Sequence, residues 1–77
     1  MSIQVTTSSD GGSYVFINRT GEPVVLTVKA IANNIVAQHH VSHLQRQPLP
    51  KGTHIVVRRA NARWWRPGRL WAEMDLV

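Results

Sequence analysis

Five arginines and three tryptophans are gathered in one short segment, Arg58 to Trp71, which reads RRANARWWRPGRLW. This arginine- and tryptophan-rich segment contains no acidic residue. Guanidinium groups form paired hydrogen bonds with phosphates and stack on aromatic rings, and an exposed indole ring offers a platform for an unpaired base. Residues of these two kinds, interleaved in one segment, therefore predict a surface that binds a polyanion.

The formal charges outside this segment cancel. The net charge of the 77-residue chain is +5, which equals the charge of the segment alone. The other charged residues are Arg19, Lys29, Arg46 and Lys51 against Asp10, Glu22, Glu73 and Asp75. A strongly basic segment favours nucleic acid, an anionic membrane face or an acidic protein as partner. The membrane is the least favoured of the three, because the arginines do not lie on an apparent amphipathic helix.

The function predicted from the segment is non-enzymatic binding of nucleic acid, preferably single-stranded DNA or RNA. The predicted site consists of phosphate contacts and a stacked base: Arg58, Arg59, Arg63, Arg66 and Arg69, with Trp64 or Trp65. A structural interpretation competes with this one, in which the tryptophans form the core and the arginine stems cover their edges. Side chains alternate along a strand, so adjacent Trp64 and Trp65 cannot both point inward.

The alternative function is a protein-interaction module or a homo-oligomeric assembly subunit, such as a viral structural protein or an inhibitor of a larger machine. The tryptophans would then be interface anchors, and the arginines would pair with acidic groups of a partner. The stretches VVLTV (24–28) and HIVV (54–57) have high β-propensity and little charge. If either lay at an open sheet edge, it would invite pairing with another copy.

The four histidines are the residues considered for a metal site or a pH-sensitive site: His39, His40, His43 and His54. In a strand, His39 and His43 share a face with Cα atoms about 13 Å apart, which is too far to share one zinc ion easily. In a helix they would be four residues apart, which is a metal-ligand spacing. His39 and His43 are therefore weak metal candidates, no cofactor is expected, and a pH-sensitive interface is slightly favoured over a metal site.

No motif indicates an enzyme. The chain lacks GxSxG, a phosphate-binding glycine loop and any cysteine nucleophile. Glu73 and Asp75 would share one face of a strand. We expect these two carboxylates to pair with neighbouring arginines.

Length and composition predict a single small domain over residues 1–77. Folding at this size buries only about 60% of the surface of the unfolded chain, so the core is thin and oligomerisation stays open. The lack of cysteine fits a reducing compartment. The first residues, MSIQVTTSSDGG, do not resemble a signal peptide, and no stretch approaches the roughly 20 apolar residues of a membrane span. A cytoplasmic protein is therefore expected.

The hydrophobic pattern of the first two thirds is mostly that of strands. Residues 3–7 and 13–19 flank a turn signal at 9–12 and predict a first hairpin. Residues 24–32 and 35–44 predict a second, with Asn33-Asn34 in its turn and Val28 facing His39. A helix over about 28–46 is the rival, although its apolar positions do not form one stripe.

The last third predicts a loop at 48–52 and a third hairpin. Pro67 and Gly68 suit a type II turn, which would place Trp65 near Leu70 and Trp64 opposite Trp71. The apolar positions switch parity near Arg58–Arg59, which predicts a β-bulge or a break there. The expected fold is mostly β, a small antiparallel barrel or sandwich of about five to six short strands. The alternative is α+β with the helix over about 28–46.

Overall fold

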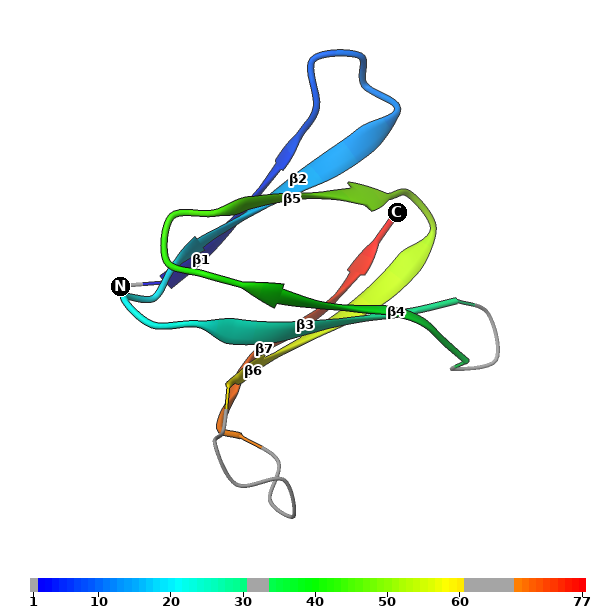
Figure 1. Ribbon diagram of the computed structural model, residues 1–77. Helices are drawn as coiled ribbons and strands as arrows, with labels where there is room; N and C mark the ends of the chain where they lie inside the picture. Colours follow the sequence, from blue (N-terminus) through cyan, green and yellow to red (C-terminus); the bar gives the residue numbers. More distant parts are fainter. Residues whose placement is uncertain (1, 31–33, 61–67) are drawn as a thin grey trace.

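The computed structural model describes residues 2–30, 34–60 and 68–77 (Figure 1). Its strands are β1 (Ser2–Thr7), β2 (Ser13–Arg19), β3 (Val24–Lys29), β4 (Ile35–Val41), β5 (Arg46–Pro50), β6 (Thr53–Arg59) and β7 (Leu70–Leu76). The predicted mostly β fold is confirmed, with seven strands instead of five to six. The alternative helix over 28–46 is wrong, because the described part of this range forms the end of β3, all of β4 and the start of β5. The described residues include no helix that could cross a membrane.

The strands form two antiparallel sheets that pack on a shared core (Figure 1). The smaller sheet has the order β1-β2-β5 and the larger one β4-β3-β6-β7. The sheets remain separate, so the fold is not a closed barrel. Of the two expected architectures, barrel and sandwich, the structure has the two-sheet one. VVLTV and HIVV lie on β3 and β6, which are inner strands of the larger sheet. Neither of these two stretches is therefore at an open edge.

The core follows the alternation of the strands. On β3 the even-numbered Val24, Leu26 and Val28 are buried, whereas the residues between them are half-buried. Apolar side chains of both sheets complete the cluster: Phe16, Val41, Leu49, Ile55, Val57 and Leu76. Fully burying one such side chain stabilises a fold by about 1.5–3 kcal/mol, so this single cluster is the main source of stability.

The β3–β4 hairpin forms, but in a register two residues away from the predicted one. Val28 pairs with Ala37 instead of His39, and His39 pairs with Leu26. The ladder shifts after Val28, and Lys29 pairs with Ile35, so the connection is longer than a two-residue turn. A shift of two residues returns each side chain to the same face, which is why the hydrophobic pattern could not detect it.

Residues 48–50, the second half of β5, were predicted as part of a loop over 48–52. Instead Pro48 pairs with Val15 and Pro50 with Ser13. Proline cannot donate to a ladder, but an edge strand has one side that needs no donor, and β5 is the edge of its sheet. Only Lys51 and Gly52 turn, with Gly52 at a φ of 79°.

A buried asparagine joins the two sheets where β2 passes to β3. The Asn18 side-chain amide donates to the carbonyl oxygens of Glu22 and Val41, both at 2.8 Å. Its side-chain oxygen accepts from the Thr20 backbone N–H at 3.0 Å and from the Thr20 hydroxyl at 2.7 Å. The Leu44 N–H donates to the Asn18 carbonyl at 2.6 Å. These bonds hold the β2–β3 loop (20–23) and the β4–β5 loop (42–45) together at one end of the molecule.

Candidate nucleic-acid interface

Three of the predicted site residues meet where β6 ends and β7 begins. Arg58 and Arg59 end β6, and Arg69 immediately precedes β7. The Arg59 N–H donates to the Arg69 carbonyl at 2.7 Å, and Arg58 Nη1 donates to the Gly68 carbonyl at 3.2 Å. A Cβ atom at Gly68 would overlap the Arg59 carbonyl oxygen, so only glycine allows this close approach. We call Arg58, Arg59, Gly68 and Arg69 the stem.

The strand pairing beside the stem differs from the tight hairpin that was predicted. Leu70 pairs with Arg58 in the ladder. The predicted positions of Trp65 near Leu70 and of Trp64 opposite Trp71 depend on residues outside the described ranges. Within the described ranges, Arg58 and Leu70 form the last pair of this ladder. The ladder shifts between Val57 and Arg58, and the irregularity predicted near Arg58–Arg59 is therefore confirmed, with Trp71 as the extra residue on β7. The predicted type II turn at Pro67–Gly68 lies partly outside the described residues, as do all of Arg63, Trp64, Trp65 and Arg66.

Trp71 anchors the stem to the core. Its half-buried ring packs against the core cluster, and the Arg69 guanidinium carbon lies 5.4 Å from the ring centroid. The Trp71 indole nitrogen is buried and has no acceptor within the described ranges. For this tryptophan the arrangement is the one that the structural interpretation predicted, with an arginine lying over a core ring.

Glu22 is the one carboxylate that reaches the stem. Its Oε2 lies 3.2 Å from Arg59 Nε, and the Ala60 N–H donates to the neighbouring Pro23 carbonyl at 3.1 Å. All four acidic residues of the chain fall in the described ranges, and none of them forms an ion pair with Arg58 or Arg69. The positive charge of the stem is therefore only partly neutralised by the protein itself.

Glu73 and Asp75 do not pair with arginines, contrary to the prediction. They hold His54 instead: Nδ1 lies 2.6 Å from Asp75 Oδ1, and Nε2 lies 2.7 Å from Glu73 Oε2. Ionised carboxylates only accept hydrogen bonds, so both contacts together favour the protonated imidazole, in which both ring nitrogens donate. The hydrogen bond to Glu73, followed by that to Asp75, raises the pKa of His54 above its ordinary value. The same bond to His54 lowers the pKa of Glu73.

The sequence prediction missed this cluster because it assumed the wrong register. A tight turn at Pro67–Gly68 leaves His54 beyond the end of β7, without a cross-strand neighbour. The observed register puts His54 directly opposite Asp75. The available signal was that Glu73 and Asp75 share one strand face and have the charge that attracts a protonated histidine. The register of β6 against β7 decided whether His54 would lie opposite them.

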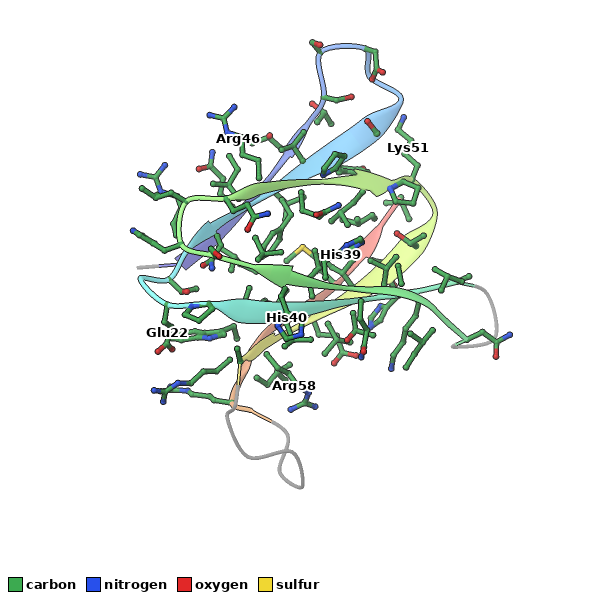
Figure 2. All side chains as sticks on the ribbon, viewed as in Figure 1. Glu22, His39, His40, Arg46, Lys51 and Arg58 are labelled. Carbon is green, nitrogen blue, oxygen red and sulfur yellow. The ribbon has the colours of Figure 1, made fainter. Side chains whose placement is uncertain are left out.

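The two weak metal candidates have separate surroundings. His39 is half-buried on β4 and pairs with Leu26 in the ladder (Figure 2). His43 lies in the β4–β5 loop, where its Nδ1 accepts from the Gly21 N–H at 3.1 Å. The helical spacing of these two residues does not apply, since His39 is in a strand. Within the described ranges no group of three or more histidine or acidic residues could hold a metal ion.

Comparison of the chain with protein-family models, with curated proteins and with solved structures finds no match in any of the three. No residue role is therefore carried over from a relative. The functional conclusion rests on the geometry and charge of the stem and its surroundings.

Proposed function

We propose that this protein is a non-enzymatic domain that binds single-stranded DNA or RNA at its stem and along the arginine- and tryptophan-rich segment. The observation that supports this most directly is the meeting of Arg58, Arg59 and Arg69, with which one described carboxylate, Glu22, forms an ion pair. Phosphates supply the negative charge that the protein itself does not provide there. A cytoplasmic setting, where single-stranded RNA is available, suits the cysteine-free composition.

Part of this surface is preorganised. Arg58 is tied to Gly68, and the Arg69 guanidinium is held near the Trp71 ring. Arginines that are already ordered lose less conformational entropy when they bind phosphate. In this proposal Arg63 and Arg66 add further phosphate contacts, and Trp64 or Trp65 stacks a base. Five phosphate contacts to a single strand give a log–log salt slope of at most roughly −3.5.

The test is binding of a fluorescent oligothymidylate of about 12 nucleotides, a length within the usual range of single-strand sites, followed by anisotropy as salt is varied. We expect the double variant Arg63→Gln/Arg66→Gln to bind more weakly, with a slope shallower by about 1.4. The matched control is Lys29→Gln/Lys51→Gln, which removes the same charge away from the stem. Absence of binding by the wild-type protein at low salt, or binding that does not respond to salt, would overturn the proposal.

A second candidate function, assembly of copies of this chain, is favoured by the free edge of β4. One side of β4 pairs with β3, and the other side pairs with no strand in the described ranges. The strand reads IVAQHHV, with no acidic residue, lysine, arginine or proline, and Ile35 and Val36 are 59% and 58% exposed. The other edges are less open, since β5 carries two prolines and β1 lies beside β7. We infer that two copies would pair antiparallel along β4 in a self-complementary contact.

Sedimentation velocity separates this candidate from a strict monomer. We expect a dimer for the wild-type protein and a monomer for Val36→Lys, because a lysine on an edge strand disfavours pairing. The control Gln4→Lys places the same charge on β1 and should leave the dimer intact. A monomeric wild-type protein at high concentration would contradict assembly through β4. The hypothesis that the tryptophans are interface anchors gains no support from Trp71, because its ring packs against the core of its own chain.

A further inference from the structure

Two more arginines stand side by side on the smaller sheet. Arg19 ends β2 and Arg46 begins β5, and the β2–β5 ladder pairs Arg46 with Ile17. Strand geometry then puts the Cα atoms of Arg19 and Arg46 about 8 Å apart. Both side chains are exposed, and both alternate with inward residues such as Asn18 and Gln47, so they share the outer face of the sheet. None of the four acidic residues forms an ion pair with either of them.

This pair lies at the same end of the molecule as the stem. The β2–β3 loop leads from Arg19 to Val24, which pairs with Arg59 in the larger sheet. The backbone bonds from Ala60 to Pro23 and from Leu44 to Asn18 join the stem and both loops into one end. In Figure 2, Arg46 and Glu22 lie at the left, where these loops turn, and Lys51 lies at the right. We call this the loop end.

Charge is distributed unequally between the two ends of the fold. The loop end carries five arginines and a single acid, Glu22, which is already paired with Arg59. The other described charges lie along the strands and at the opposite turns: Lys29, Lys51, Asp10, Glu73 and Asp75. Two of these acids, Glu73 and Asp75, are hydrogen-bonded to His54. Besides this hydrogen bond, Glu73 lies near enough to Arg58 that the arginine charge helps to lower its pKa, but the two form no ion pair. The excess positive charge of the described residues is therefore concentrated at the loop end.

We propose that Arg19 and Arg46 form a second phosphate-binding pair, so that a single strand held at the stem continues around the loop end onto the outer face of the smaller sheet. This inference rests on the proposed nucleic-acid function and extends its site to residues outside the arginine- and tryptophan-rich segment. Packed sheets lie about 10 Å apart. Known single-strand sites of small β domains cover about 4–16 nucleotides, which is enough chain to reach both the stem arginines and the Arg19–Arg46 pair.

The test compares Arg19→Gln/Arg46→Gln with Lys29→Gln/Lys51→Gln, two pairs that remove the same charge from different ends. Binding of the oligothymidylate is measured between about 50 and 200 mM salt. Losing two phosphate contacts makes the salt slope shallower by about 1.4. Over this salt range the affinity of the wild-type protein should therefore fall about sevenfold more than the affinity of Arg19→Gln/Arg46→Gln. The lysine pair should keep the wild-type slope. Arg19→Lys/Arg46→Lys retains the charge and should therefore keep most of the wild-type salt slope.

The outcomes separate this inference from the function on which it rests. Suppose that Arg19→Gln/Arg46→Gln has the same salt slope as Lys29→Gln/Lys51→Gln, while Arg63→Gln/Arg66→Gln weakens binding. The second phosphate-binding pair is then overturned and the proposed function stands. If the wild-type protein does not bind the oligonucleotide at low salt, both are overturned. Single variants, each expected to change the slope by about 0.7, provide the same comparison should the double variant fail to fold.

Discussion

His54 shows how strongly one side chain depends on its cross-strand neighbours. Its ring is held by carboxylates on β7, both within 2.7 Å, on the outer face of the larger sheet. These carboxylates are hydrogen-bonded to His54 and form no ion pair with the arginines of the stem, although the charge of Arg58 helps to lower the pKa of Glu73. The same contacts make the stability of the protein depend on pH at this position.

We predict that this contribution is largest between pH 4.5 and 6.5, the ordinary pKa values of Glu73 and His54. The pKa of His54 is raised, so its contribution is fully present below 6.5 and is lost as the pH rises through the raised value. The pKa of Glu73 is lowered, so its contribution is present above 4.5 and is lost as the pH falls through the lowered value. Melting temperatures of the wild-type protein and His54→Gln should therefore differ most in this window and converge on both sides of it.

His40→Gln is the matched control for this measurement. His40 is an exposed histidine of the larger sheet, whereas His54 is half-buried, and His40 has no carboxylate partner among the described residues. Its substitution should leave the shape of the pH profile unchanged. A His54→Gln profile parallel to that of the wild type across the whole pH range would show that the two contacts contribute nothing to stability.

Among the elements, the junction of β6 and β7 is the one whose geometry the candidate site requires most. The register shift at Val57 and the close approach of Gly68 to Arg59 bring Arg58, Arg59 and Arg69 together. The extra residue, Trp71, fixes this irregular end of the ladder to the core. Strand β5 illustrates the same dependence on context, since its prolines are compatible with a ladder only because β5 is an edge.

We predict that Gly68→Ala destabilises the protein by about 1–3 kcal/mol, the usual range for forcing extra atoms into a packed position. The new Cβ would overlap the Arg59 carbonyl oxygen, and backbone has to move to relieve the overlap. Urea unfolding measures the change. Gly12→Ala is the control, because a Cβ there would meet only the Asp10 side chain, at 3.5 Å. Equal stability of the two variants would contradict the close approach in the stem.

At the scale of the whole molecule, the main property is the concentration at the loop end of arginines of which only Arg59 forms an ion pair within the described residues. Five arginines from β2, β5, β6 and the residue before β7 are brought there by the two-sheet topology. A polyanion that binds this end interacts with the folded state, because the unfolded chain does not hold these arginines together. Binding and folding are therefore linked.

We predict that an oligothymidylate at about 100 times its dissociation constant stabilises the folded protein by about 2.7 kcal/mol. For a domain of this size the melting temperature should rise on the order of 10 °C. Differential scanning fluorimetry at low salt measures the shift, and the rise should shrink as salt is added. An unchanged melting temperature at a saturating concentration would argue against any specific complex with the folded protein.

Most of the strands could be predicted from the sequence because the signal for a strand is local. The alternation of Val24, Leu26 and Val28 with more polar residues assigns both the strand and its buried face. The parity change near Arg58 likewise indicated the irregular ladder. The candidate site was only partly predictable, since Arg19, Arg46 and His54 carry no special pattern in their own neighbourhoods.

The sequence by itself determined which residues alternate, which faces are apolar, and that five of the nine basic residues fall in a single segment. Only the tertiary structure decided the registers, the place of β5 at an edge, the capture of Glu73 and Asp75 by His54, and the arrival of Arg19 and Arg46 at the stem's end of the fold. The physical reason is that alternation has a period of two residues, so a ladder that slips by an even number keeps every face unchanged. Connection lengths and packing between distant strands select among such ladders, and they also select which charges meet.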